Sequence, residues 1–369
     1  MQPIAYLEVY GMGNNLKKIN KNIIALELGT NTMKLVIGDV RKDELIIRKA
    51  IQSPMPGSLY ANGEIIDMEG LSANLKHLIK NNKIHEKKCF CCIESGQIIT
   101  RDVSVPSSNK DTLQDMAKYE VEQFLPIDME NYSVQSVVMK EMEIEDKPFA
   151  EMLVTAVPKR LIEQVHTLIH KAGLEPIVLD TQANTFAKLI ENQRRLNGND
   201  YHRENTVAFI DLGYEKVRIS IFQKGKMRFQ RLLDFGGKDI DQNISKFASM
   251  PLDEAQRSKM GIHNLNYPVN ELTDEGKVVN IIKSTLDHWF EEITKVFRYY
   301  SSRNAIAGQI EYIYIYGGLS KINGFEDYIQ SVFNLPTERI KKVSSVTLDQ
   351  QVQLDLTEIL NALGVMYRR

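Results

Sequence analysis

One strand-turn-strand pattern occurs twice in this chain, and this repeat constrains the fold more than any other feature. The first copy covers residues 22–38 and the second covers residues 206–223. In both copies, runs rich in β-branched residues predict strands on either side of a turn that begins with glycine, at Gly29 and at Gly213. An acid lies two positions before each glycine, and these acids, Glu27 and Asp211, are 184 positions apart in a chain of 369 residues. The spacing predicts two similar halves.

Each of these turns suits phosphate binding. Backbone N–H groups at a hairpin tip can point at a polyphosphate, and glycine leaves the approach open because it has no Cβ. Two halves that face each other across a cleft can hold a polyphosphate between two such tips. The acid at each strand end is placed to hold Mg²⁺ through water, since hydrated magnesium takes only one or two protein carboxylates. One copy taken alone is better explained as an ordinary β-hairpin.

A third glycine element follows a strand near the C-terminal end. Residues 311–316 predict a strand that runs into Gly317 and Gly318, and residues 325–333 predict a helix. Paired glycines at a strand exit let a flat base or a phosphate lie against the backbone. Together with Phe235-Gly236-Gly237 and with Ala255-Gln256-x-x-Lys259, this order of elements resembles the actin-like ATPase superfamily.

Within that superfamily, the chain resembles the PilM family of type IV pilus assembly proteins from Asn22 to Arg369. The segment that favours this family over the related FtsA cell-division proteins is Glu120-Val-Glu-Gln-Phe-Leu-Pro126, which precedes 132–135. An amphipathic helix that ends at Pro126 also explains this segment. Asp180 lies in another family-like stretch, although it can also cap the helix predicted over 182–191.

The resemblance implies a binding site for ATP or ADP with Mg²⁺. It places Lys34 with residues 29–32 at the first phosphate motif, Asp211 and Gly213 at the second, and Lys259 at the base or ribose. Asp211 would hold Mg²⁺ through water, with Glu27 as a further candidate, and no catalytic residue is assigned. Three departures from the family pattern predict weak or absent hydrolysis: Glu27 replaces Asp, Gln256 replaces Glu, and 214–216 replace a small, hydroxyl-rich tip. The glycine and polar residues implied at the nucleotide are Gly29, Thr30, Asn31, Thr32, Gly213, Gly236, Gly237, Gly317 and Gly318.

The implied fold class is α/β, with duplicated actin-like (ribonuclease H-like) halves around a nucleotide cleft and an inserted α+β subdomain of PilM/FtsA type. Strand and helix patterns over 97–178, including helices at 111–125 and 160–172, predict that insertion. The first half is expected at 22–96, 179–200 and 335–369, and the second at 205–240 and 280–334. A helical cap is expected at 241–279, and residues 1–21 are expected to form a leader outside the fold.

The function implied by the resemblance is that of a nucleotide-binding adaptor of the pilus assembly machine. We expect the 97–178 subdomain and the first half to form a groove for the cytoplasmic N-terminal tail of PilN. The chain would then lie in the cytoplasm, at the inner face of the membrane, held there by the membrane-associated pilus assembly complex, and self-association is a further expectation. The alternative is an active, filament-forming ATPase or a sugar-kinase-like phosphotransferase, because fold alone does not fix function.

Composition excludes several other classes. Lys and Arg total 46 against 48 Asp and Glu, a net charge of −2, so nothing indicates nucleic-acid binding. No apolar run reaches the roughly 18 residues of a membrane span. The three cysteines, Cys89, Cys91 and Cys92, lie in one predicted strand, where Cys92 faces away from the other two. They predict buried thiols in a reducing compartment rather than a disulfide framework or a metal site.

Overall fold

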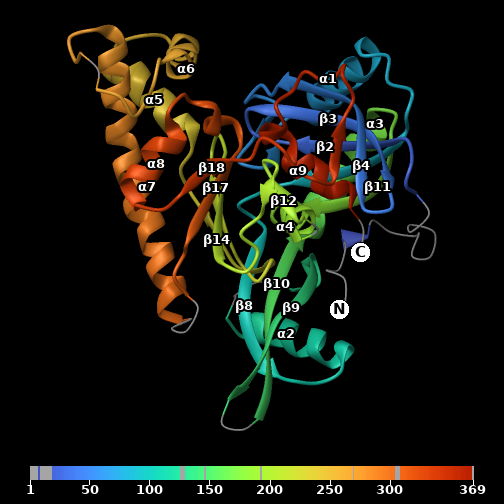
Figure 1. Ribbon diagram of the computed structural model, residues 1–369. Coiled ribbons are helices and arrows are strands. Elements are labelled where there is room, and N and C mark those ends of the chain that lie inside the picture. The colour runs from blue at the N-terminus through green and yellow to red at the C-terminus, as the bar shows by residue number, and fades with distance from the viewer. Residues whose placement is uncertain are drawn as a thin grey trace. The chain divides into compact units, whose positions relative to one another are not determined.

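The computed structural model (Figure 1) describes residues 7–8, 19–124, 129–144, 147–191, 193–268, 270–303 and 308–367. These residues divide into two compact units. The first unit holds the described residues within 1–189, 345–354 and 361–369, and the second holds those within 190–344 and 355–360. Each unit is built on its own central sheet.

The first unit contains a seven-stranded sheet with the order β1-β11-β7-β2-β3-β4-β19. Strands β2, β3 and β4 form an antiparallel meander, whereas β7 runs parallel to β2 and β11 runs parallel to β7. Every residue of β2 is buried, as expected of a central strand covered on both faces. The strands are β1 (Leu7–Glu8), β2 (Ile23–Leu28), β3 (Thr32–Arg41), β4 (Glu44–Pro54), β7 (Lys88–Ile93), β11 (Glu175–Thr181) and β19 (Val346–Leu348).

Helices α1 (Met68–Asn81) and α3 (Lys159–Lys171) cover one face of this sheet. Their buried residues, such as Leu75 and Val165, join Leu26 in a single core cluster. Helix α1 begins after Asp67, whose carboxylate accepts the Gly70 N–H at 3.0 Å as an N-cap. A short hairpin, β5 (Tyr60–Ala61) with β6 (Glu64–Ile65), precedes α1, and α4 (Gln182–Glu191) and α9 (Leu356–Met366) contribute residues to both units.

A smaller sheet in the first unit has the order β8-β10-β9. Helix α2 (Lys110–Phe124) lies across one face (Figure 1), where Leu113 and Val121 pack with Val105 and Val154 in a separate core. The strands are β8 (Ile99–Pro106), β9 (Tyr132–Ile144) and β10 (Lys147–Pro158), and a 3₁₀ turn, η2 (Met129–Asn131), precedes β9.

The insertion predicted over 97–178 is too long. Helix α3 packs on the seven-stranded sheet through Leu161, Val165 and Leu168, and β11 pairs with β7, so the separate sheet and its core end at Pro158. The amphipathic stripe of α3 is the physical reason, because it must bury its apolar face against the larger sheet. The helices predicted at 111–125 and 160–172 differ from the observed bounds by one residue at each end, and Pro126 lies outside the described residues.

The second unit contains a five-stranded sheet with the order β16-β15-β14-β17-β18. Strands β14, β15 and β16 form an antiparallel meander, and β17 and β18 continue from β14 in parallel. The order β4-β3-β2-β7-β11 of the first unit has the same directions, which confirms the predicted pair of related α/β halves. The strands are β14 (Thr206–Leu212), β15 (Val217–Gln223), β16 (Lys226–Leu233), β17 (Tyr312–Tyr316) and β18 (Thr337–Arg339).

Four helices accompany this sheet, and α5 and α6 gather at one end of the long helix α7 (Figure 1). Their apolar faces form one core with β14, β15 and β17, in which Trp289 stacks on Phe235 with ring centroids 5.0 Å apart. The helices are α5 (Gly237–Phe247), α6 (Leu252–Gly261), α7 (Asp274–Arg303) and α8 (Phe325–Phe333), with a 3₁₀ turn, η3 (Gly318–Lys321), and the short hairpin β12 (Arg195–Leu196) with β13 (Asn199–Asp200).

Three predicted boundaries differ from the structure. Residues 190–200 and 335–344 lie in the second unit, because β18 pairs with β17 and the Asn197 N–H donates to the Lys342 carbonyl at 2.9 Å. The helical cap is expected to end at residue 279. Helix α7 runs through that position with one continuous apolar stripe, so no domain boundary lies there. The other predicted domain limits stay predictions.

The expected leader lies mostly outside the described residues, but Leu7–Glu8 pair with β11. Among the described helices, none combines the length and the apolar character that crossing a bilayer requires. Cys89, Cys91 and Cys92 are buried free thiols, and Cys92 alone is absent from the core cluster under α1 and α3, as predicted from strand alternation.

Candidate functional site

The turn between β2 and β3 is a tight hairpin tip. The Gly29 N–H donates to the Thr32 carbonyl at 3.1 Å, and a Cβ at position 29 would lie 2.7 Å from that oxygen. Glycine is therefore required by the turn itself. The Asn31 carbonyl accepts the Met55 N–H at 2.9 Å, which fixes the tip at the end of β4. Residues 29–32 are half-buried or exposed, so a ligand can reach them.

The acid of this hairpin, Glu27, is 3 % exposed and already has a cation. Its Oε1 accepts from Lys34 Nζ at 2.7 Å, because Glu27 and Lys34 are opposite each other in the β2–β3 ladder. Its second oxygen, Oε2, is buried and has no hydrogen-bond partner among the described residues. A buried oxygen of this kind fits a metal-bound water, whereas Lys34 is committed to the carboxylate.

The sheet register extends this pair into a row of polar groups. Glu27, Cys92 on β7 and Asp180 on β11 are successive partners across the parallel strands. Burial, together with Glu27, Cys91 and Asp180, raises the pKa of the Cys92 thiol well above its usual range. The thiol is therefore neutral and separates the two carboxylates.

Asp180 does not cap helix α4. Its Oδ2 accepts from Lys188 Nζ at 2.5 Å, and the two side chains are 4 % and 1 % exposed. The capping oxygen is the Thr181 hydroxyl, which accepts the Asn184 N–H at 3.3 Å. Asp180 Oδ1 instead accepts the Thr181 N–H and Asn184 Nδ2, both at 2.8 Å, so the carboxylate supports the capping residue and, among the described residues, accepts no N–H from the first turn of the helix.

Asp211 takes the corresponding place on β14 in the second unit. Its Oδ2 accepts from Arg218 Nη1 at 3.2 Å, and the two residues are opposite each other in the β14–β15 ladder. Gly317 lies directly beside Asp211, since a Cβ there would be 2.6 Å from Asp211 Oδ1. Gly317 also has φ +88°, a conformation that favours glycine. Gly317, which follows β17, is therefore packed directly against the Asp211 carboxylate.

The glycines at 213, 236 and 237 meet at the start of α5. The Gly237 N–H donates to the Gly213 carbonyl at 3.1 Å, and a Cβ on Gly236 would be 2.5 Å from the Tyr214 carbonyl oxygen. The helix begins here, with the Gly236 N–H donating to Asp239 Oδ2 at 2.8 Å. The next two N–H groups are also used, since Lys238 donates to the Tyr214 carbonyl at 2.8 Å and Asp239 to the Gly236 carbonyl at 2.9 Å. These bonds fix the backbone of the three glycines.

Lys259 lies below Gly237 and is 4 % exposed. Its Nζ pairs with Asp241 Oδ1 at 2.5 Å and donates to the Gly237 carbonyl at 3.3 Å. Burial lowers the pKa of Lys259 although Asp241 opposes this, and burial raises the pKa of Asp241 although Lys259 opposes that. Gln256, one turn earlier, donates to the Tyr214 hydroxyl at 3.2 Å. The predicted contact of Lys259 with a base or ribose stays a prediction.

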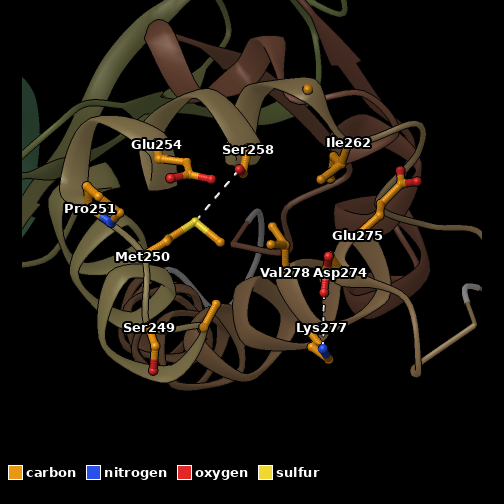
Figure 2. Close-up of a pocket in the computed structure, with 12 residues that line it drawn as sticks. Ser249, Met250, Pro251, Glu254, Ser258, Ile262, Asp274, Glu275, Lys277 and Val278 are labelled. Atoms are coloured by element: carbon orange, nitrogen blue, oxygen red, sulfur yellow. Dashed lines mark hydrogen bonds and ion pairs between the residues drawn. The ribbon is translucent and has the colours of Figure 1, made fainter.

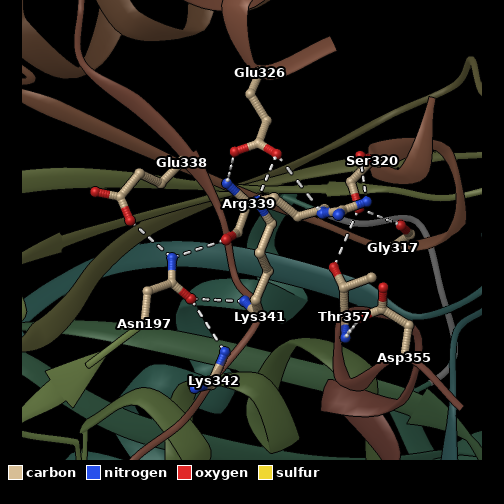
Figure 3. Close-up of polar contacts among 10 residues, drawn as sticks. All are labelled: Asn197, Gly317, Ser320, Glu326, Glu338, Arg339, Lys341, Lys342, Asp355 and Thr357. Atoms are coloured by element: carbon tan, nitrogen blue, oxygen red, sulfur yellow. Dashed lines mark hydrogen bonds and ion pairs between the residues drawn. The ribbon is translucent and has the colours of Figure 1, made fainter. Parts of the chain in front are cut away.

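The Gly317–Gly318 loop is held by hydroxyl groups (Figure 3). The Ser320 hydroxyl donates to the Gly317 carbonyl at 2.6 Å and lies 3.1 Å from the Thr357 hydroxyl, while the Gly317 N–H donates to the Thr357 carbonyl at 3.0 Å. Arg339 Nη1 donates to the Ser320 carbonyl at 3.4 Å. A Cβ at Gly318 would meet nothing within 4 Å, so space is open beside its backbone.

The structure therefore brings most predicted site residues together within each unit. In the second unit, Gly213, Gly236 and Lys259 meet at Gly237, and Gly317 separately contacts Asp211, with Gly318 next in the chain. Glu27, Lys34 and residues 29–32 form one group in the first. Residues 29–32 are accessible in the first unit, and space is open beside Gly318 in the second. The prediction that both turns contact one nucleotide stays a prediction.

The sequence interpretation missed Arg218 and Asp241. Arg218 lies seven positions after Asp211, and Lys34 lies seven positions after Glu27, so the repeat itself carried the signal for both ion pairs. No comparable signal marks Asp241, which meets Lys259 only because α5 and α6 pack together.

Comparison with known families finds that residues 25–368 match a family model described as type IV pilus assembly protein PilM. Among solved structures, the chain is similar to one described as a PilM–PilN type IV pilus biogenesis complex. The TM-score is 0.77 at 19 % sequence identity, over 94 % of this chain and 98 % of the matched chain.

One further solved structure has a similar fold, and one further protein is similar in sequence. MreB5 of Spiroplasma citri, solved bound to ADP, has a TM-score of 0.54 at 13 % identity, over 94 % of each chain. The cell division protein FtsA of Bacillus subtilis (strain 168) is 24 % identical over 272 residues, which span 67 % of this chain and 59 % of FtsA. The match thus spans less than two thirds of FtsA. The predicted actin-like fold is confirmed, and the MreB5 structure shows that this fold can hold a nucleotide.

Proposed function

Because the chain belongs to the PilM family of type IV pilus assembly proteins, we propose that it is an adaptor that binds the N-terminal tail of PilN and carries a nucleotide. The observation that carries the proposal is the family match over residues 25–368, joined to similarity over nearly the full length to a chain solved in a PilM–PilN complex. In this role the chain reaches a membrane-embedded machine through its partner.

The proposed peptide site lies in the first unit, where the β8-β10-β9 sheet accompanies the larger sheet. A short tail can add main-chain hydrogen bonds at a strand edge or fill apolar pockets. Strands β8 and β9 are the outer strands of the three-stranded sheet, so each has an edge that no other described strand occupies. The affinity is expected to be modest, since a disordered tail must be ordered on binding.

The structure suggests a clean deletion for testing this site. Ile99 and Ala156 are opposite each other in the β8–β10 ladder, so a short glycine linker can join residue 98 to residue 157 and remove only the smaller sheet and α2. The core under α1 and α3 stays complete. A labelled synthetic PilN tail titrated against the full chain should bind, and the deletion variant should lose that binding while keeping its thermal unfolding transition. Equal binding by both, or none by the full chain, would remove the peptide proposal.

The nucleotide proposal rests on the second unit. We assign the phosphates to the backbone at Gly213, Gly236 and Gly237, and the adenosine to the open side of Gly318. Lys259 is expected to support this backbone through the Gly237 carbonyl. Mg²⁺ supplies charge neutralisation for the phosphates when bound, and Asp211 and Glu27 are the carboxylates proposed to hold its water ligands.

Slow turnover is part of this proposal. Both candidate metal acids already pair with a cation of the chain, Lys34 or Arg218, which lowers the local negative charge available to Mg²⁺. Steady-state hydrolysis by the purified chain should therefore be slow or absent. Rapid hydrolysis would favour an ATPase instead of the adaptor.

A matched pair of glycine variants tests the nucleotide site. Gly318→Leu places a side chain in space that is open in the protein, so the fold should tolerate it and ATP binding should fall at least tenfold. Gly57→Leu, at another glycine with open space around its Cβ, is the control and should bind ATP like the parent chain. Binding is read from the thermal shift with ATP or ADP, where ligand at about 100 times its Kd adds roughly 2.7 kcal/mol. An unchanged shift for Gly318→Leu would contradict the assignment of the adenosine.

A further inference from the structure

A cavity of about 550 Å³ lies between α6, the start of α7 and the loop that joins α5 to α6 (Figure 2). The volume is within the range of small-ligand and peptide-anchor pockets. Its apolar wall continues the core of the second unit: Ile262 and Val278 are buried, and Met250 packs against them. The Met250 side chain points across the cavity, where its sulfur accepts from the Ser258 hydroxyl at 3.8 Å.

The cavity is preformed on its α7 side. A Cβ on Gly276 would lie 2.0 Å from the Asn270 carbonyl oxygen, so the loop before α7 rests directly on the helix. The Glu275 carboxylate accepts the His263 N–H at 2.5 Å and ties the loop after α6 to the same turn. Two walls are therefore fixed by hydrogen bonds and close packing.

The polar groups of the cavity decide what it can accept. Three carboxylates, Glu254, Asp274 and Glu275, line it against one ammonium group, Lys277, which pairs with Asp274 at 3.0 Å. The α7 N-terminus does not attract anions here, because Thr273 Oγ1 already accepts the Gly276 N–H at 3.0 Å and two acids occupy the first turn. An anionic ligand is thus disfavoured, and a cationic one is favoured.

A metal ion is not the cation. Within the described ranges, no group of three His, Cys, Asp or Glu side chains has the arrangement needed to hold one. Carboxylates spread around an apolar wall suit instead the Lys or Arg side chains of a peptide, which interact at longer range and remain partly solvated.

The chain segments that line the cavity also carry exposed apolar side chains. Of ten large apolar side chains that are exposed in the described part of the chain, five fall between positions 247 and 272. Phe247 and Leu252 adjoin lining residues in sequence and are 65 % and 44 % exposed, and Leu272 is 87 % exposed. Exposed apolar side chains on the segments that line a pocket with acidic groups are typical of a protein interaction site. The remaining two are Met260 and Tyr267.

We propose that this cavity docks a short segment of a partner protein in which an apolar side chain is flanked by Lys or Arg. The apolar side chain enters beside Met250 and Val278, and the flanking cations face Glu254 and Glu275. The site lies within the second unit, so it is separate from the PilN site proposed in the first unit and does not depend on it.

The test begins with a phage-displayed library of random 12-residue peptides selected on the immobilised full chain. Two variants fill the cavity: Ser258→Trp, and Gly261→Leu, whose new side chain meets open space. Selected peptides should combine Leu, Ile, Phe or Met with neighbouring Lys or Arg, and by fluorescence anisotropy should bind both variants at least tenfold more weakly. Peptides without basic residues, or equal binding to the filled variants, would overturn the proposal, as would a selection that yields no binder.

Two neighbouring acids of α6 provide the matched charge control. Glu254 lines the cavity, whereas Asp253, 70 % exposed and paired with Arg257 at 2.9 Å, does not. Glu254→Lys should weaken the selected peptides at least tenfold, and Asp253→Lys should change their affinity less than twofold. Equal losses would indicate only general electrostatic attraction and would overturn the proposal. If Glu254→Lys instead changes the sedimentation of the chain alone and leaves peptide binding intact, the occupant is a second copy and the partner assignment is wrong.

Discussion

The two hairpins that open the two units are built alike. In each, an acid lies two residues before the turn glycine and pairs with a cation seven residues later, as Glu27 with Lys34 and as Asp211 with Arg218. In each, a Cβ on the glycine would collide with the carbonyl oxygen three residues on, at 2.7 Å for Gly29 and at 2.5 Å for the second copy. The repeat therefore preserves an ion pair as well as a backbone shape.

The surroundings of the two acids differ. On the first sheet the row continues from Glu27 through Cys92 to the buried pair of Asp180 with Lys188, whereas on the second sheet the neighbour of Asp211 on β17 is Tyr316. One oxygen of Glu27 lacks a hydrogen-bond partner among the described residues. The first copy thus has a denser set of buried charges, and its largest dependence should lie at the most buried pair, that of Asp180 with Lys188.

Lys188→Met should show the largest effect. It leaves Asp180 buried without its cation, and breaking a buried pair in this way costs about 3–5 kcal/mol. We expect a loss of that size in the free energy of opening of β2, measured by native-state hydrogen exchange. The control is Lys171→Met, which breaks an ion pair with Glu69 in the same unit, whose members are 41 % and 77 % exposed, and should cost less than about 1 kcal/mol. A loss below 1 kcal/mol for Lys188→Met would mean that the buried ion pair of Asp180 with Lys188 does not stabilise the first sheet.

Removing the cation of each hairpin compares the two copies directly. Arg218→Met removes the cation beside Asp211 at a position where the arginine side chain is 4 % exposed, and we expect a loss of about 3 kcal/mol. The side chain of Lys34 is 13 % exposed, so water can replace it more easily, and Lys34→Met should cost about 2 kcal/mol. The fluorescence of Trp289, the only tryptophan, reports urea unfolding of the second unit, and hydrogen exchange in β2 reports the first. The reverse order would contradict the ranking by burial.

The hairpins could be predicted from sequence because their determinants are local. A run rich in β-branched residues, a turn glycine and an acid two positions before it specify strand, tip and register together. The pairing of Asp211 with Arg218 follows from that register, since a four-residue tip places positions seven apart opposite each other. By contrast, the contacts of Lys188 and Lys259 depend on how helices pack, which no local pattern encodes.

Domain limits failed for the same reason. Residues 335–344 were assignable only by knowing that β18 would pair with β17, a contact between segments 24 residues apart at Ile313 and Thr337. Helix α3 has a clear apolar stripe, but the stripe does not say which of two sheets it covers. Sequence pattern thus predicted the elements closely and the sheet to which each belongs less well.

Magnesium dependence tests which acid holds the metal. Glu27→Gln should weaken Mg²⁺-dependent ATP binding about tenfold, or roughly 1.4 kcal/mol, because its unpartnered oxygen is the better acceptor for a metal-bound water. Asp211→Asn should weaken it less, about threefold, since Asp211 has no buried oxygen that lacks a hydrogen-bond partner among the described residues. Calorimetry with Mg²⁺ and with EDTA separates the effects, and both variants should bind metal-free ATP like the parent. Equal losses with and without Mg²⁺ would mean that neither carboxylate is a metal residue.

The smallest expected effect concerns the ends of the two hairpins that lie farthest from their turns. Asp39 near the end of β3 accepts the Asn22 N–H at 2.8 Å and pairs with Arg48 at 2.6 Å, whereas the position 184 residues later is the neutral Gln223. Burial raises the pKa of Asp39, but the Asn22 N–H and Arg48 outweigh it, so the pKa is lowered overall.

A lowered carboxyl pKa gives stability that is present above the unfolded pKa, about 3.9 for Asp, and is lost as pH falls through the folded pKa. Asp39→Asn should therefore cost about 0.5–1 kcal/mol at pH 7, since Arg48 is 35 % exposed, and nothing at pH 2. Gln223→Ala should show no such pH dependence, because no titrating group is removed. Hydrogen exchange in β3 and β15 between pH 3 and pH 7, with urea unfolding at pH 2, measures both. A difference between Asp39→Asn and the parent that persists at pH 2 would show that the asparagine acts through packing, and the contrast between the two hairpins would then not be electrostatic.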